Sequence, residues 1–170
     1  DASGATDSQN VQIKITGSND ASIITANDVS GTIVEGTSLS DNGSISFSDV
    51  DLSDTPNATQ ASKSISALKA DGSTQITLTV AQQTAISNAF SITAITSNTN
   101  NGDITWSFNS LNAATPESFD YLAAGEVLTL TYVVKTSDSN GATDTQNVQI
   151  KITGSNDASI ITANDVSGTI

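Results

Sequence analysis

The chain of 170 residues contains no cysteine, histidine or methionine, and all five of its basic residues are lysine. The lack of cysteine excludes a disulfide-stapled fold and a thiolate zinc site. Without histidine or cysteine, the usual acyl-transfer triads cannot be assembled, and paired carboxylates alone do not supply a substrate cleft. No run of about 18 apolar residues is present, so no segment is expected to insert into a membrane. The sequence therefore predicts a protein that is not an enzyme.

Positive charge is also scarce, because 18 acidic residues face five basic ones and the net charge is −13. Nucleic acid is excluded as a partner, since phosphate binding needs a basic face. Most of the acids are Asp, which tolerates turns and can reach a metal ion from a loop, so the composition points to calcium. The alternative interpretation is a solvated acidic surface that keeps the protein soluble.

The first 33 residues return almost unchanged as the last 33, with an offset of 137 residues from Asp1 to Asp138. Only positions 2, 3 and 8 differ from positions 139, 140 and 145. We expect residues 1–20 to be the tail of a preceding repeat, 21–157 one complete repeat, and 158–170 the head of the next. Faithful tandem copies are typical of spacer and adhesive modules rather than of catalytic domains.

Alternating apolar and polar residues predict short β-strands. In Asn147–Ile152, for example, the apolar side chains Val148, Ile150 and Ile152 share one face. Trp106 alternates with Ile104 and Phe108, which predicts a core position. The expected strands are Ser22–Thr25, Gly31–Glu35, Ser44–Phe47, Gln60–Ser66, Thr74–Thr79, Phe90–Ile95, Gly102–Asn109, Glu117–Phe119, Val127–Lys135 and Asn147–Ile152.

Helix-forming residues at about 80–90 break this pattern and predict one short helix. We therefore expect an all-β fold, a seven-strand antiparallel Ig/cadherin-like β-sandwich with that helix added. In such a sandwich, alternate loops lie at the same end. This would bring together the polar residues of the first junction, of the loop after the second strand and of the hairpin after the sixth. Those residues are Asn19, Asp20, Asp49, Asp51, Asp54, Asp138 and Asn140.

Carboxylates packed together repel one another unless a cation lies among them, and calcium takes six to eight oxygen ligands. A second, sparser group is expected at the opposite end, from Glu35, Asp120, Asn156 and Asp157. A simpler interpretation stays open for Asp120, which could cap a turn, and for Asp144, which could be a turn residue in the hairpin.

Several segments of the chain resemble the VCBS repeat, a bacterial cadherin-like module of very large RTX-type adhesins exported by type I secretion. The resemblance rests on Phe119–Glu126, Leu128–Tyr132, the Asp138–Asp144 loop and Ile152–Ala158, with Ser48–Thr55 matching the front half of the family. It implies calcium at the junctions between repeats, an extracellular location on the bacterial cell surface, and a role in cell adhesion or biofilm formation. One departure is Ser159, where the family commonly has proline.

The leading hypothesis is a structural extender whose partners are the neighbouring repeats of the same chain, stiffened by Ca²⁺ at the junctions. The alternative is an adhesive module that binds a polysaccharide, a surface or a second copy of itself, for which Trp106 would be the candidate platform.

Overall fold

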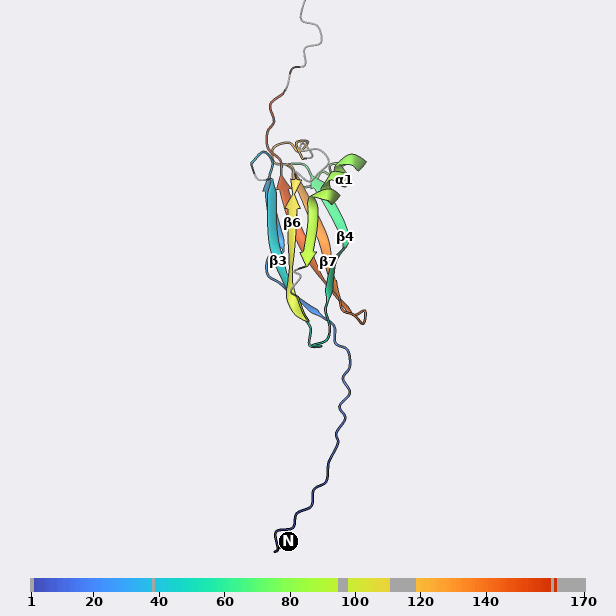
Figure 1. The fold of residues 1–170 in the computed structure, drawn as a ribbon. Helices are drawn as coiled ribbons and strands as arrows, with labels where there is room; N and C mark the ends of the chain where they lie inside the picture. Colours follow the sequence, from blue (N-terminus) through green and yellow to red (C-terminus); the bar gives the residue numbers. More distant parts are fainter. Residues whose placement is uncertain (1, 38, 95–97, 111–118, 160, 162–170) are drawn as a thin grey trace, which may run out of the picture.

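The structure, a computed structural model, describes residues 2–37, 39–94, 98–110, 119–159 and 161. Its strands form two four-stranded sheets that face each other (Figure 1). One sheet has the order β1 (Ile23–Ala26), β3 (Ser40–Ser48), β6 (Asn101–Asn109) and β5 (Phe90–Ala94). The other has the order β2 (Ser30–Val34), β8 (Thr143–Thr153), β7 (Val127–Ser137) and β4 (Asn57–Leu68). The predicted all-β sandwich is confirmed.

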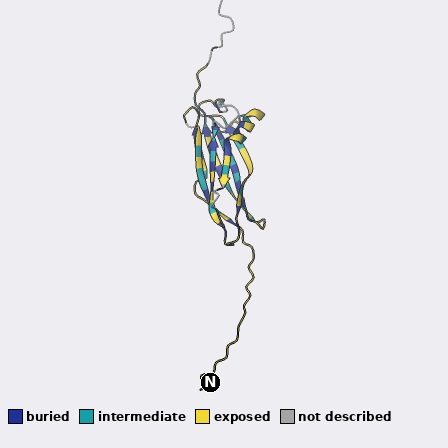
Figure 2. Cartoon of the chain, viewed as in Figure 1, coloured by how far each residue is buried: buried dark blue, intermediate teal, exposed yellow. Residues whose placement is uncertain are grey.

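The core lies between the sheets, where every second side chain of β7 and of the second halves of β6 and β8 is buried (Figure 2). Trp106 is fully buried, as predicted, and its indole nitrogen donates a hydrogen bond of 2.6 Å to the carbonyl of Asp28. Tyr132 stacks on Phe90 with ring centroids 3.9 Å apart, and its hydroxyl donates to the carbonyl of Ile86. The polar atoms of both large aromatic side chains are therefore satisfied inside the core.

The first strand of the sandwich is split between the two sheets. β1 pairs antiparallel with β3, whereas β2 pairs parallel with β8. A carboxylate from the opposite sheet supports each half: Asp144 accepts from the backbone nitrogen of Ile24 (2.8 Å), and Asp41 accepts from that of Thr32 (2.7 Å). Counted as one split strand, β1 and β2 give the seven predicted strands. Asp144 thus lies within β8 and is not a turn residue.

The predicted short helix is α1 (Val80–Ala89), which buries Ala85, Ile86 and Ala89. It begins with a capping box, in which the Thr79 hydroxyl accepts from the Gln82 nitrogen and the Gln82 side chain accepts from the Thr79 nitrogen. The cap holds the start of the helix, and the buried residues hold it against the core.

Two predicted strands are not found as strands in the described residues. Thr74–Thr79 was expected to be a strand, but it makes only an isolated bridge between Gln75 and Leu68 before the chain diverges towards α1. The predicted strand Glu117–Phe119 lies mostly outside the described residues. Phe119 itself is in a turn, and its buried ring packs against Phe108 with centroids 5.9 Å apart.

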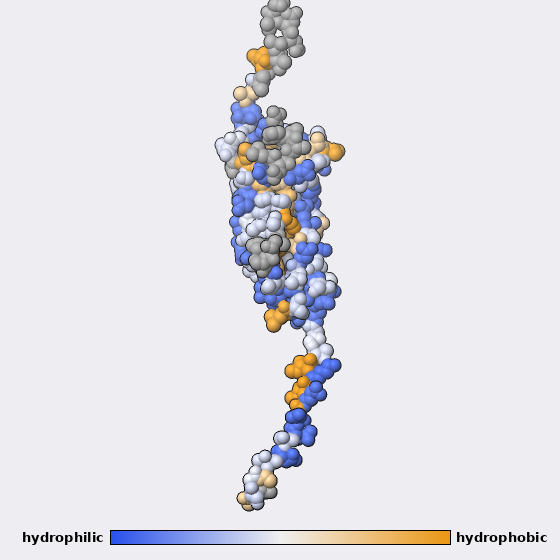
Figure 3. Space-filling model, in the orientation of Figure 1, coloured by the Kyte–Doolittle hydropathy of each residue, from blue (hydrophilic) through white to orange (hydrophobic). Residues whose placement is uncertain are grey.

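The two described ends of the chain leave the sandwich at opposite poles (Figure 1). Residues 4–20 contain no helix or strand and are exposed throughout. Within them, the side chains of Val11, Ile13 and Ile15 are 80–89% exposed, although their counterparts Val148, Ile150 and Ile152 in β8 are fully buried. Figure 3 shows hydrophobic residues along this exposed segment. A segment that has the sequence pattern of β8 but packs on no sandwich fits the prediction that residues 1–20 belong to a preceding repeat, which stays a prediction.

Gly43 offers a test of the core packing. A Cβ atom added there would lie 2.6 Å from the indole of Trp106. We expect Gly43→Ala to destabilise the fold by about 1–3 kcal/mol, because the ring has no room to shift. Chemical denaturation followed by Trp106 fluorescence measures the change. Gly17→Ala is the control, since a Cβ there meets nothing within 4 Å, and an equal loss in both variants would contradict this packing.

Candidate metal centre

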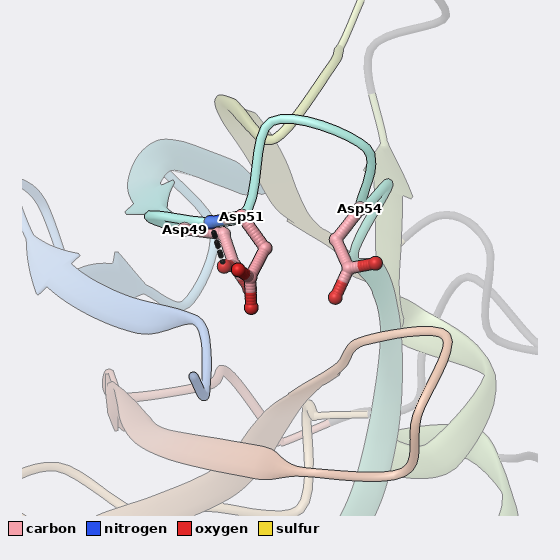
Figure 4. A group of neighbouring side chains, drawn as sticks. All are labelled: Asp49, Asp51 and Asp54. Atoms are coloured by element: carbon pink, nitrogen blue, oxygen red, sulfur yellow. Dashed lines mark hydrogen bonds between the residues drawn. The ribbon is translucent and has the colours of Figure 1, made fainter. Parts of the chain in front are cut away.

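Three aspartates cluster in the loop that joins β3 to β4 (Figure 4). One carboxylate oxygen from each of Asp49, Asp51 and Asp54 lies within 4.8 Å of the others, an arrangement that could hold a metal ion. The loop folds on itself because Asp49 accepts from the backbone nitrogen of Asp51 (2.9 Å) and the Asp54 nitrogen donates to the Asp51 carbonyl (3.0 Å). The sequence-predicted trio is thus brought together.

Asp49, like Asp54, is a buried member of the trio. Its residue is only 5% exposed, and its Oδ2 atom is buried without a hydrogen-bond partner among the described residues. Two asparagines that the sequence did not single out fix its backbone: Asn100 donates to the Asp49 carbonyl (2.7 Å), and Asn101 accepts from the Asp49 nitrogen (3.3 Å). A buried, unpaired carboxylate oxygen is costly, and a bound cation would satisfy it.

The first junction meets this loop and the β7–β8 hairpin, as predicted. The backbone nitrogen of Asp20 donates to Asp51 (2.7 Å), and the Asn19 amide donates to Asp138 (3.0 Å). Asp138 also accepts from the backbone nitrogens of the hairpin residues Asn140 and Ala142. The pKa of Asp138 is held below its usual value, chiefly by the Asn19 amide. Burial opposes this lowering, and the backbone hydrogen bonds add to it.

The hairpin also contacts Asp54. Ser139, which the sequence did not single out, donates to Asp54 Oδ1 (2.8 Å). The Asn140 amide nitrogen points to Asp54 Oδ2 (3.4 Å) and donates to the side-chain oxygen of Asn19. The surrounding hollow has a volume of about 280 Å³ and is lined by Gly17, Ser18, Asn19, Asp51, Ser53, Asp54 and Asn140. The structure therefore brings together all seven residues predicted for this end.

A smaller group lies at the opposite end, around Glu35. This residue is 4% exposed, and its Oε2 accepts from the backbone nitrogen of Ser155 (2.6 Å), whereas its Oε1 has no partner among the described residues. Burial raises the pKa of Glu35, the Ser155 hydrogen bond opposes this rise, and the charges of Asp157 and Asp120 add to it. Three of the four predicted residues are thus electrostatically coupled.

The fourth predicted residue, Asn156, is exposed and donates to the carbonyl of Asp157 (3.4 Å), as Asn19 does to that of Asp20 (3.1 Å) in the other copy. Asp120 is an exposed turn residue next to Tyr121. The buried Tyr121 hydroxyl has no partner among the described residues, and burial followed by the charge of Glu35 raises the pKa of Tyr121 to about 12. A hollow of about 260 Å³ lies beside these groups.

Comparisons with known proteins give only distant structural likenesses. No protein-family model and no curated protein sequence matches the chain. The chain is similar to the sialic acid binding region of a Streptococcus sanguinis adhesin (16% identity, TM-score 0.42), covering 81% of this chain and 29% of that one. It is also similar to a PapD-like domain of human CEP192 (10% identity, TM-score 0.40), covering 89% of this chain and 96% of that one. Such values carry no argument about ligands, and the VCBS resemblance stays a prediction.

Glu35 generates a prediction about stability without metal. The raised pKa means that the folded protein disfavours the charged form of Glu35. The resulting loss of folding stability begins as the pH rises above the usual pKa of glutamate, and it is complete above the raised pKa. We expect Glu35→Gln to raise the melting temperature at neutral pH in chelator, because glutamine keeps an oxygen for Ser155. The gain should shrink towards acidic pH.

The matched control is Glu126→Gln, at a half-buried carboxylate that accepts from the backbone nitrogen of Ala123. This control variant should not raise the melting temperature at neutral pH in chelator. A lower melting temperature for Glu35→Gln in chelator, at every pH, would contradict the account of this end.

Proposed function

We propose that this chain is a calcium-binding extender unit of a tandem array on a bacterial cell surface. The observation that carries the proposal is the aspartate trio of the β3–β4 loop, with the buried and unpartnered Oδ2 of Asp49. The trio lies at the pole where the preceding segment of chain enters, through the hydrogen bond from Asp20 to Asp51. A cation there would act on the connection between two units.

The donor set favours calcium over other metals. The chain has no histidine or cysteine, so it offers no nitrogen or sulfur ligands of the kind that zinc and copper prefer. Asp49, Asp51 and Asp54 supply carboxylate oxygens from one loop, and Asp138 supplies another from the hairpin. Calcium accepts six to eight oxygens in irregular geometry, whereas magnesium demands a near-ideal octahedron. Backbone carbonyls and waters would complete the shell.

The stiffening would follow from linkage between metal binding and order. A cation that binds only when the entering chain lies against the β3–β4 loop and the hairpin stabilises that arrangement. Extracellular modules bind calcium at roughly 10⁻⁴ to 10⁻³ M, a range in which external calcium sets the occupancy. Because the chain repeats, the pole with Glu35 in one unit would face the pole with the trio in the next, and each junction would combine both groups.

Adhesion and biofilm formation are proposed for the array as a whole, on the basis of the VCBS resemblance. The alternative, a ligand-binding module, loses its platform, because Trp106 is fully buried. A hollow of about 360 Å³ lies beside β4, and the described residues that line it are all non-aromatic: Lys63, Ile65, Ala67, Gln75, Ile76, Leu78 and Gln83. Among the described residues, no helix is long and apolar enough to cross a membrane.

Thermal unfolding with calcium, with magnesium and with chelator tests the proposal. At a calcium concentration about one hundredfold above the dissociation constant, one site adds about 2.7 kcal/mol to the free energy of unfolding. This raises the melting temperature by several degrees. The double variant Asp49→Asn with Asp51→Asn should lose most of this rise. The control double variant, Asp7→Asn with Asp103→Asn, removes the same charge outside the cluster and should keep it. A calcium effect that both pairs retain, or none at all, would sink the proposal.

A further inference from the structure

Three Asn-Gly pairs occur in the chain, at Asn42-Gly43, Asn101-Gly102 and Asn140-Gly141. In such a pair the backbone nitrogen of glycine can attack the side-chain amide carbon of asparagine, because glycine has no Cβ to obstruct the approach. The reaction also needs backbone freedom, since the nitrogen and the amide carbon must come into bonding distance. The structure gives the three pairs very different freedom.

Two of the pairs are held in the first sheet. Asn42 and Gly43 lie inside β3, opposite Ser107 and Trp106 of β6, and Gly43 also packs against the Trp106 indole. Asn101 and Gly102 begin β6, opposite Ser48 and Phe47 of β3, and the Asn101 side chain accepts from the Asp49 nitrogen. In an extended strand the side chain stands away from the backbone of the next residue. Both pairs would have to leave the sheet before they could react.

The third pair lies at the tip of the β7–β8 hairpin. Asn140 and Gly141 are both exposed and fall between the end of β7 at Ser137 and the start of β8 at Thr143. The Gly141 nitrogen makes a long hydrogen bond of 3.4 Å to the Asp138 carbonyl and also contributes to lowering the pKa of the Asp138 carboxylate, so its partners all lie within the same hairpin. Gly141 also has a φ of +93°, a conformation that suits glycine and that a side chain would strain. A small local motion of the hairpin therefore frees the attacking nitrogen.

We propose that Asn140 is a site of spontaneous deamidation, which converts the hairpin amide into a carboxylate within the candidate metal centre. The Gly141 nitrogen forms a bond to the side-chain carbonyl carbon of Asn140 and gives its proton to solvent, and the side-chain nitrogen takes up a proton from solvent, breaks its bond to that carbon and leaves as ammonia. Water then opens the cyclic imide at either carbonyl, which yields aspartate or isoaspartate. Water is the only co-reactant that the sequence of steps needs.

The product changes the electrostatics of the centre. The Asn140 amide nitrogen faces Asp54 and donates to Asn19, and the modified residue loses both contacts. It places a further negative charge beside Asp54, which raises the repulsion among the acids without a cation and adds an oxygen ligand with one. This consequence, unlike the modification itself, rests on the proposed function. The preceding copy has Ser3 at the corresponding position, so its Ser-Gly pair cannot react in this way.

Peptide mapping of the full chain tests the modification without any metal. Cleavage after lysine places the three pairs on separate peptides, residues 15–63, 70–135 and 136–151. After incubation in a mildly alkaline buffer with chelator, we expect the Asn140 peptide to convert to the acid at least about tenfold faster than the other two, because they react only after local unfolding. Equal rates, or faster conversion at Asn42 or Asn101, would overturn the proposal. Asn140→Ser, which copies the preceding repeat, should abolish the signal in peptide 136–151.

A second measurement separates this proposal from the calcium hypothesis. Asn140→Asp copies one product, and it should melt below the wild-type chain in chelator and gain more from calcium. An unchanged melting temperature in chelator would overturn the electrostatic consequence. A lower melting temperature in chelator without any gain from calcium would support the coupling to Asp54 and contradict the metal centre instead.

Discussion

The repulsion among carboxylates held at one pole of the sandwich is the constraint on which the arrangement of its loops depends. Asp49, Asp51 and Asp54 share one loop, Asp138 lies in the facing hairpin, and the buried Oδ2 of Asp49 has no partner among the described residues. Hydrogen bonds from the entering chain and the hairpin to Asp51, Asp54 and Asp138 offset part of this repulsion, and Asn100, just before β6, holds the backbone carbonyl of Asp49. A cation would offset the rest, and it would tie the same three segments together.

The sandwich supplies the rigid frame for that pole. β3 ends where the trio begins, and β7 and β8 enclose the hairpin that carries Asp138, so a core built on Trp106, Tyr132 and the alternating residues of β7 fixes the distance between the two acidic segments. The split first strand adds a further connection, since Asp41 and Asp144 reach across from opposite sheets to hold its two halves. The described chain enters and leaves the sandwich at opposite poles (Figure 1), as the proposed extender role requires.

Much of this could be predicted from the sequence, because strand alternation and loop order are local properties. The alternation placed β7, β8 and the buried Trp106, and the rule that alternate loops share an end brought Asn19, Asp49 and Asp138 together. The same pattern failed for Thr74–Thr79, which alternates like a strand but finds no edge to pair with beyond Gln75. A strand needs a neighbouring strand to pair with, and the sequence pattern of one segment does not show whether such a neighbour is available.

Tertiary contacts account for the features that the sequence did not predict. Asn100, Asn101 and Ser139 are ordinary polar residues in the sequence, and their roles follow from the proximity of β6 and the hairpin to the acidic loop. The burial of Glu35 could likewise not be predicted from the sequence, since a glutamate after a strand is usually solvated. Its burial follows from the packing of β2 beside β8 and from the bond to Ser155.

The most direct test of the central claim is a calcium titration followed by the backbone amide signals of the chain in nuclear magnetic resonance. The account predicts that calcium shifts the signals of Asn19 and Asp20, of the Asp49–Asp54 loop and of the Asp138–Ala142 hairpin, and that magnesium at the same concentration does not. Shifts spread evenly over exposed acids such as Asp71 and Asp103, or no shifts at all, would contradict it and leave the acidic pole as surface charge.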